Sequence, residues 1–231
     1  MSARYAIYFA PARDSAWWAF GAHWLGRDEH DNAALAQPTL TGLSAVELQL
    51  LTEEPRRYGF HATLKAPFRL ADGIDESALI KRQHALAQSL RAVPLGPLRV
   101  ACLGNFVALL PVHTPPELQG LAQACVTELD DLRAPMLASE LLRRRKQDLD
   151  ARAVELLERY GYPHVLERFR LHLTLTGPLE PALAERVCAA LDAKIAALNV
   201  AQPLVLDRLC LFVEKNPGAP MQRIIDLKLQ A

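Results

Sequence analysis

The chain has 231 residues, and its 26 Lys and Arg residues balance 26 Asp and Glu, so its formal net charge is zero. Hydrophobic residues make up 51% and charged residues 23%, which is typical of a soluble globular protein. This composition excludes collagen, a coiled coil, a disordered chain and a disulfide-dense scaffold. Zero net charge argues against binding of duplex nucleic acid but is compatible with a local phosphate site.

No segment predicts a leader peptide or a membrane span. The apolar run near the N-terminus is short and closes at Pro11, and no stretch approaches the roughly 18 apolar residues that span a bilayer. The 4 cysteines form no C-x-x-C pair, which argues against a zinc or redox motif. We therefore expect a cytoplasmic protein with no membrane partner.

The first half of the chain predicts alternating strands and helices. In chain order these are a strand (4–9), a helix (14–25), a loop (26–43), a short helix ending by Pro55, a strand (57–64), a helix (75–92) and two strands (97–103 and 105–111). Ser44 and Glu47 have capping-box spacing, and Asp75 is a suitable N-cap. Gly104 and Asn105 form a turn signal between the last two strands.

The second half predicts a similar series. Its elements are two helices (116–132 and 148–160), a strand (169–176), a helix (181–198) and two strands (203–213 and 221–229). A tight turn at 216–218 joins the last two strands. The alternation of strands and helices, together with the tight turns, predicts an α+β fold with largely antiparallel sheets.

An eight-residue pattern occurs twice. Residues 61–68 are HATLKAPF and residues 172–179 are HLTLTGPL, which share His-x-Thr-Leu-x-small-Pro-apolar. A helix and two strands follow each copy, so we expect a duplicated fold. It would be one bilobal domain (1–231) with pseudo-two-fold lobes at about 1–115 and 116–231, and an exchange of elements between the lobes is compatible with this expectation. The sheets would line a central cleft, with the helices outside.

Strand geometry gives the repeated pattern a chemical meaning. Alternate residues of a strand point to one face, so His61 and Thr63 share a face and His172 and Thr174 share another. If the lobes pack about a two-fold axis, both pairs meet in the cleft. One neutral and one protonated imidazole then form a general base and acid. The threonine hydroxyls can bind phosphoryl oxygens, and neither a metal nor a cofactor is required.

These motifs resemble those of the two-histidine (2H) phosphoesterase superfamily. The segments YAIYFAP, WWAFGAHWLGRD and RRYGFHATLKAPF are similar to the bacterial subfamily associated with phosphonate-utilisation operons. The resemblance covers nearly the whole chain. It implies a bilobal α+β fold and metal-independent chemistry on cyclic phosphodiesters or related 2′-phosphate linkages, with His61, Thr63, His172 and Thr174 at the superfamily's motif positions.

Other polar residues are candidates for substrate binding. Lys65 lies two residues beyond Thr63 and would face the same cleft, although a solvated strand-end lysine is an equal alternative. Arg170 shares the predicted face of His172, and Tyr8 lies on the less apolar face of the first strand. Tyr58 has the opposite parity to His61 and is expected to be a packing residue. The cationic run 143–146 is interpreted as a solvated helix face, with phosphate or RNA binding as the alternative.

The favoured function is a phosphodiesterase that opens a small cyclic phosphate, of the ribose 1,2-cyclic or nucleoside 2′,3′-cyclic type, in phosphonate catabolism. Two alternatives stay open. One is a non-catalytic module that binds phosphosugars or RNA ends, and the other is an RNA 2′-end ligase or transesterase. Because both motifs lie in one chain, we expect a monomer whose partner is the small phosphate-ester substrate.

Overall fold

Antiparallel pairing organises the sheets. The structure is a computed structural model that describes residues 3–145 and 149–231. One sheet contains, in order, β2 (Ala62–Phe68), β1 (Arg4–Phe9), β8 (Arg208–Glu214) and β9 (Gln222–Lys228). A second sheet contains β4 (Leu98–Leu103), β5 (Phe106–Pro111) and β6 (Leu173–Thr174), and β3 (Val93–Pro94) pairs with β7 (Val205–Leu206). The predicted mixed α+β class with antiparallel sheets is thus confirmed.

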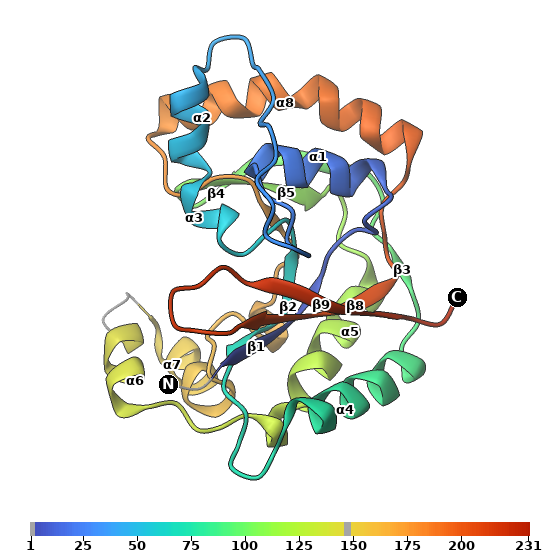
Figure 1. The fold of residues 1–231 in the computed structure, drawn as a ribbon, viewed down its shortest axis with the longest axis vertical. Helices are drawn as coiled ribbons and strands as arrows, with labels where there is room; N and C mark the ends of the chain where they lie inside the picture. Colours follow the sequence, from blue (N-terminus) through green and yellow to red (C-terminus); the bar gives the residue numbers. More distant parts are fainter. Residues whose placement is uncertain (1–2, 146–148) are drawn as a thin grey trace.

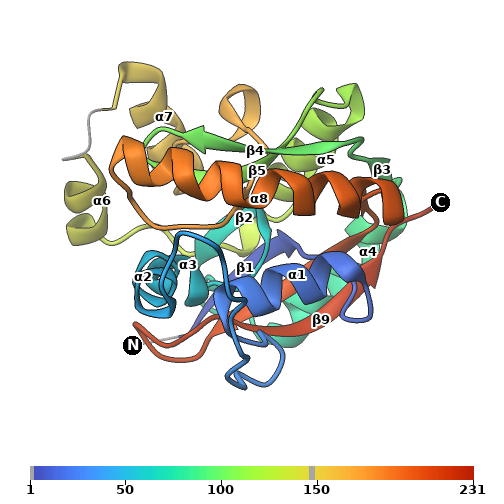
Figure 2. The same cartoon turned by 90° about the horizontal axis from the view of Figure 1, so that it is seen from above.

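The α-helices cover the sheets. They are α1 (Ala16–Leu25), α2 (Ala45–Leu51), α3 (Glu53–Arg56), α4 (Glu76–Ser89), α5 (Pro116–Thr127), α6 (Ala138–Arg145), α7 (Ala151–Tyr160) and α8 (Pro181–Ala201). Helix α8 packs on β4 and β5, α5 packs on β2, and α4 packs on β8 and β9 (Figures 1 and 2). In the described part of the chain, none of these helices combines the length and apolarity that crossing a membrane requires.

Local signals in the sequence explain several boundaries. The side chains of Ser15 and Asp75 accept hydrogen bonds from the first turns of α1 and α4. The predicted capping box is present at α2, where the Ser44 and Glu47 side chains each bond the other's backbone N–H. These interactions satisfy amide groups that would otherwise lack partners at a helix start.

Two predicted strands have other bounds in the structure. The strand predicted at 57–64 begins at Ala62, because α3 continues to Arg56 and Gly59 then takes a left-handed φ of 80°. The strand predicted at 169–176 is reduced to β6, whose two residues are those that pair with Leu109 and Ala108 of β5. The helix predicted at 148–160 is described from Ala151, and its first residue, 148, lies outside the described residues.

Both large sheets combine strands from the two halves of the sequence. In the first sheet, β1 and β2 pair with strands beyond residue 200, namely β8 and β9. In the second, β6 joins β4 and β5 from the first half. The first histidine motif therefore enters the four-stranded sheet and the second enters the three-stranded sheet. The halves 1–115 and 116–231 are interleaved.

Candidate active site

The two repeated motifs line one pocket. His61 and Thr63 at the start of β2 share a cavity of about 460 Å³ with His172 and Thr174 at β6. This volume is in the range of small-molecule sites, about 300–1,000 Å³. The spatial juxtaposition expected from the repeat is therefore present in the structure.

Burial follows the alternation that the sequence predicts. The neighbours of the first motif, Phe60, Ala62 and Leu64, are each at most 2% exposed. In the second copy the buried leucines stand at 171, 173 and 175. Since apolar side chains anchor each motif in the core, the histidine and threonine of each copy are left to line the pocket.

Main-chain contacts fix the orientation of His61. Its Nδ1 lies 2.9 Å from the Gly59 carbonyl oxygen, and since a carbonyl can only accept, Nδ1 carries the proton. The unprotonated Nε2 of the neutral ring then accepts from the Thr63 hydroxyl at 3.2 Å. The ring of Tyr8, 1% exposed, stacks on the imidazole with centroids 3.8 Å apart. Tyr8 also lines the pocket, as its strand position predicts.

A buried arginine holds the loop that precedes His61. Arg27 donates from Nε to the Arg56 carbonyl at 2.7 Å and from Nη2 to the Arg57 carbonyl at 3.1 Å. The same guanidinium donates to the Met221 carbonyl at 3.1 Å. These bonds tie the loop to the β8–β9 hairpin, so they position Gly59 and, through its carbonyl, His61.

The second histidine has the same kind of support. Nδ1 of His172 lies 2.8 Å from the Arg170 carbonyl, which fixes the same tautomer. Trp24 of α1 donates from Nε1 to the Leu175 carbonyl at 2.7 Å. The buried Thr176 hydroxyl accepts from the Val107 amide at 3.0 Å, so the short strand β6 is held from two sides.

Both imidazoles are biased toward the neutral form. Burial lowers the pKa of His61 from 6.5 to about 4; the Gly59 hydrogen bond opposes this shift and the nearby His172 adds to it. Burial also lowers the pKa of His172, against the hydrogen bond to the Arg170 carbonyl. Before an anion binds, the pocket therefore holds two neutral rings near pH 7, rather than the one neutral and one charged ring expected from unperturbed values.

Lys65 lies outside this pocket. Its Nζ is buried and donates to the Val126 carbonyl at 2.9 Å and to Asp130 at 3.0 Å. The cause is a bulge in β2: Tyr8 pairs with Thr63, but the next residue of β1, Ile7, pairs with Lys65. The extra residue reverses the alternation beyond Thr63, so Lys65 points to the face opposite the one the sequence predicts.

Two further side chains take places that were not fully predicted. Arg170 is exposed and is not among the described residues lining the pocket; it contributes its backbone carbonyl to His172 instead. Tyr58 packs against the buried cluster that contains Tyr8 and Met221, as predicted, and it also lines the pocket, which was not predicted. Strand alternation does not apply to either segment.

Several pocket residues have no local signal in the sequence. They are Arg4, Glu54, Asn105, Phe106 and Tyr162. Arg4 and Tyr162 come from elements far apart in the sequence, so only the tertiary fold places them together. Asn105 belongs to the predicted turn between β4 and β5 and Phe106 follows it, but that turn signal does not predict that the two residues line the pocket.

Within the cationic run at 143–146, the structure describes one side chain, that of Arg144. Arg144, on α6, lines the cavity and donates to the Gly161 carbonyl at 3.0 Å. Lys146 lies outside the described residues. The interpretation of this run as a solvated helix face therefore does not apply to Arg144.

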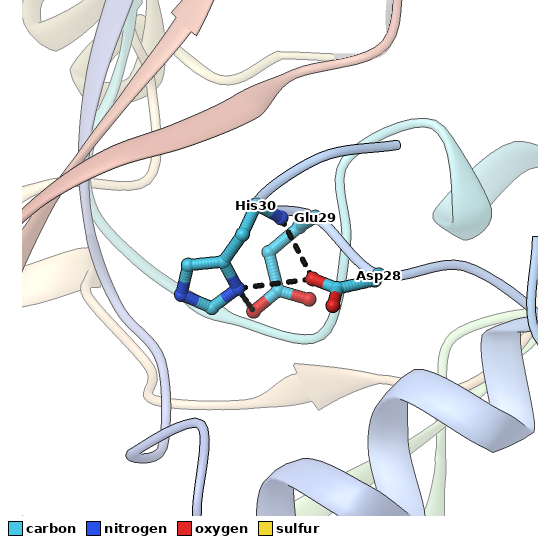
Figure 3. A group of neighbouring side chains, drawn as sticks. All are labelled: Asp28, Glu29 and His30. Carbon is cyan, nitrogen blue, oxygen red and sulfur yellow. Dashed lines mark hydrogen bonds and ion pairs between the residues drawn. The ribbon is translucent and has the colours of Figure 1, made fainter. Parts of the chain in front are cut away.

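One group of possible metal ligands lies outside the pocket lining. Ligand atoms of Asp28, Glu29 and His30 lie within 4.8 Å of one another (Figure 3). Arg13 already pairs with Asp28 at 2.5 Å and Arg223 with Glu29 at 3.2 Å. Because guanidinium groups neutralise both carboxylates, the group is better described as an ion-pair network than as a metal site.

The chain is similar to proteins of one named family. A family profile described as "Protein of unknown function (DUF1045)" matches residues 63–222. Two curated relatives carry the name "Ribose 1,5-bisphosphate phosphokinase PhnN", from Janthinobacterium sp. (strain Marseille) and Laribacter hongkongensis (strain HLHK9). They are 42% and 38% identical over 220 residues, which is 94% of this chain but 49% of each relative. The chain thus spans about half their length. It belongs to the DUF1045 family.

Proposed function

We propose that the protein is a metal-independent cyclic phosphodiesterase of the 2H phosphoesterase type. One observation carries this proposal: two H-x-T motifs line one pocket, and each histidine has Nδ1 held by a carbonyl two residues earlier. That contact makes Nε2 the atom of each ring that can take or give a proton, and at His61 the Thr63 hydroxyl that bonds Nε2 in the ligand-free pocket would turn to the phosphate. A shared tautomer in a pocket of ligand size is what acid–base catalysis by two imidazoles requires.

The reaction follows from this geometry. His61 is the general base, because its pKa of about 4 keeps it neutral, and Nε2 takes a proton from the attacking water. The water oxygen forms a bond to phosphorus while the bond from phosphorus to one ring oxygen breaks. His172 gives its Nε2 proton to that oxygen. Thr63 and Thr174 donate hydrogen bonds to the non-bridging oxygens, and the product is a phosphomonoester.

His172 must be protonated to act as the acid. Burial lowers its pKa in the ligand-free pocket. A bound cyclic phosphate brings a negative charge, which favours the imidazolium form and raises the pKa again. Substrate binding would therefore supply the charged acid, while burial disfavours protonation of His61.

A duplicated architecture accompanies this proposal. We propose that the chain is one bilobal domain whose two lobes each carry one motif and exchange strands, with β8 and β9 in the sheet of the first motif. Since both motifs belong to one chain, a single chain would suffice for catalysis. Light scattering on the active protein tests this, because activity confined to a dimer fraction would contradict it.

The ring that is opened would be a ribose 1,2-cyclic or a nucleoside 2′,3′-cyclic phosphate. The resemblance to the phosphonate-operon subfamily favours the first, with a role in phosphonate catabolism. The names of the relatives give further support, since ribose 1,5-bisphosphate is a ribose with a phosphate on the anomeric oxygen. Breaking the 2-oxygen bond of a ribose 1,2-cyclic phosphate leaves a phosphate at that same position.

Phosphorus NMR on a panel of cyclic phosphates tests the proposal. We expect His61→Ala and His172→Ala each to lower kcat at least about 100-fold, which is the usual effect of removing a general acid or base. His84→Ala, at an exposed position of α4, is the matched control and should retain full activity. EDTA should have no effect.

Three outcomes would contradict the proposal. Full activity in both pocket variants would remove the histidines from the reaction. Loss of activity with a chelator would indicate metal chemistry. Ligand binding with unchanged phosphorus signals would indicate a non-catalytic binding module.

A further inference from the structure

Two of the four cysteines meet in the fold. Cys102, near the end of β4, is exposed, and Cys188, near the start of α8, is half-buried. Their side chains are in hydrogen-bond contact, although they come from opposite halves of the chain. The sequence contains no C-x-x-C motif, so the pair arises only because α8 packs along β4 (Figure 2).

The register of α8 on β4 is fixed at its other end by an asparagine. The Leu98 amide donates to Oδ1 of Asn199 at 2.9 Å, and Nδ2 of Asn199 donates to the Leu98 carbonyl at 2.8 Å. From Asn199 back to Cys188 the helix covers about 16 Å. From Leu98 to Cys102 the strand covers about 13 Å. The two lengths agree to within the reach of a side chain, so the register brings the two sulfurs together.

Both cysteines lie on faces that pack together. Alternate residues of a strand share one face, so Cys102 is on the same face of β4 as Leu98 and Val100, which pack in the main core. Cys188 packs against the same core, beside the buried Val187. Cys102 lies one residue before the end of β4 and is also open to solvent. One sulfur is therefore accessible to a solute, and the other is held against it.

The surroundings give the two thiols different roles. Burial raises the pKa of Cys188 to about 11, and the neighbouring Cys102 adds to this shift. The carboxylates of Asp192 and Glu185 raise the pKa of Cys188 further. Cys188 therefore stays a protonated thiol near pH 7. Cys102 is the sulfur that a solute reaches first, and Cys188 is positioned to react with it afterwards.

Two other uses of the cysteines fit less well. A zinc site needs three or four protein ligands. In the part of the chain that the structure describes, no third His, Cys, Asp or Glu forms a compact ligand group with this pair. The remaining cysteines, Cys125 and Cys210, are buried, and burial raises the pKa of both thiols, so neither is open to a solute. A disulfide within the pair is the reaction that the arrangement supports.

We propose that Cys102 and Cys188 are a redox modification site, which a small-molecule disulfide such as oxidised glutathione converts to an intramolecular disulfide. The Cys102 thiolate attacks one sulfur of oxidised glutathione, which forms a mixed disulfide and releases one glutathione. Cys188 then attacks the Cys102 sulfur, its proton passes to the departing thiolate, and the second glutathione leaves. Two cysteine thiols are oxidised, and one glutathione disulfide is reduced to two thiols.

The new bond would brace the wall of the pocket that faces His172. Cys102 lies just before the turn that leads to Phe106, whose ring centroid is 5.8 Å from that of His172. The carbonyl of Asn105, in the same turn, accepts from the Leu179 amide at 2.7 Å, just before α8 begins. A bond between α8 and β4 would therefore restrain the hairpin where it enters the pocket. It would also stabilise the fold, because it closes a long loop.

Thiol counting and peptide mapping test this site. The protein is incubated with oxidised glutathione, denatured and alkylated, and we expect two free thiols instead of the four of the reduced protein. The tryptic peptides 100–133 and 187–194 should be recovered as one linked peptide, which a reductant separates. The Tm of the oxidised protein should rise by about 5 °C or more, as expected for a disulfide that closes a long loop.

Cys125→Ala is the matched control. Cys125 shares the peptide 100–133 with Cys102, so this variant shows which of the two is linked, and it should keep both the linked peptide and the rise in Tm. Cys102→Ser should lose both, and because this position is exposed the variant should fold like the wild type. Cys188→Ala should keep a stable glutathione adduct on Cys102, because no second thiol displaces it.

Three results would overturn the redox site. Four free thiols after oxidation would mean that the pair does not react. A stable glutathione adduct on Cys102 of the wild type would mean that Cys188 does not reach it. A dimer on a non-reducing gel that Cys102→Ser abolishes would mean that Cys102 pairs with a second copy of the chain. Each result is independent of the opening of cyclic phosphates, which phosphorus NMR measures separately.

Discussion

His61 and His172 are held by the same main-chain contact. The Nδ1 atom of each lies within 2.9 Å of the carbonyl oxygen two residues earlier, that of Gly59 or of Arg170. The contact selects the Nε2-basic tautomer of the neutral ring in both cases. It uses only backbone on the acceptor side, so a change of the Arg170 side chain can leave the ring of His172 in place.

The lowered pKa values of the two histidines predict an acidic optimum for kcat/KM. The productive free enzyme has neutral His61 and protonated His172. The rate should therefore rise through the pKa of His61, about 4, and fall through that of His172, which burial places below 6.5. A pH series of kcat/KM from 4 to 8 checks this prediction.

The profile of kcat should lie at higher pH than that of kcat/KM. It reports the substrate complex, in which the bound anion raises both histidine pKa values. An optimum of kcat/KM above pH 7 would contradict the neutral, desolvated state of the two rings.

The two threonines should affect the rate more than stability. Thr63→Val and Thr174→Val keep the shape of the side chain but remove a hydroxyl that faces the pocket. Losing one hydrogen bond to a charged transition state should lower kcat about 10- to 100-fold. Thermal unfolding should change little, because both threonines lie at the pocket surface and neither is fully buried in the core. Unchanged kcat in both variants would remove the threonines from the mechanism.

Lys65 should be important for stability and not for substrate binding. Its buried ammonium bonds the Val126 carbonyl and Asp130. Lys65→Met keeps the apolar stem but leaves Asp130 with Arg133 as its remaining ion-pair partner. We expect the free energy of unfolding to fall by about 1–3 kcal/mol and KM to stay within about two-fold.

Urea unfolding and steady-state kinetics on the same preparation check both parts of the Lys65 prediction. Lys81→Met, at an exposed position of α4, is the control and should change neither quantity. A large rise in KM at unchanged stability would return Lys65 to the substrate site.

The sequence predicts the correct strand face for Thr63 but the wrong one for Lys65, two residues later. This difference shows where the alternation of side chains along a strand stops being a reliable guide. The positions of His61 and Thr63 followed from period-two alternation, because buried neighbours fix which face they take. Lys65 did not follow, because a one-residue bulge between Thr63 and Lys65 reverses the pattern. Nothing in the letters HATLKAPF signals that bulge, which arises where β2 pairs with β1.

Arg4 and Arg144 also line the pocket, and their places there could not be predicted for another reason. Arg4 opens β1 and Arg144 lies in a helix that had no strong periodic signal, so their meeting depends on how α6 packs beside the sheet. The internal repeat could indicate two convergent motifs because each copy is local. Residues that complete the pocket from unrelated elements leave no such pattern.

Gly59 should be required for the placement of His61. Its φ of 80° is strained for any residue with a Cβ, and a Cβ there would lie 2.9 Å from the Cβ of Glu29. Gly59→Ala should therefore cost about 2 kcal/mol of stability, from strain and from a close contact. Because the Gly59 carbonyl holds the His61 ring, the shift needed to relieve that contact should also lower kcat, with KM little changed.

Gly73→Ala separates the two effects of the Gly59 substitution. Gly73 has a φ of 81°, with nothing within 4 Å of an added Cβ, so its substitution carries the backbone strain without the contact. It lies between β2 and α4 and supports neither histidine. After correction for the folded fraction, kcat of Gly59→Ala should fall well below that of Gly73→Ala. Equal values would mean that the Gly59 carbonyl does not position the base, and that His61 is oriented by its stacking on Tyr8 alone.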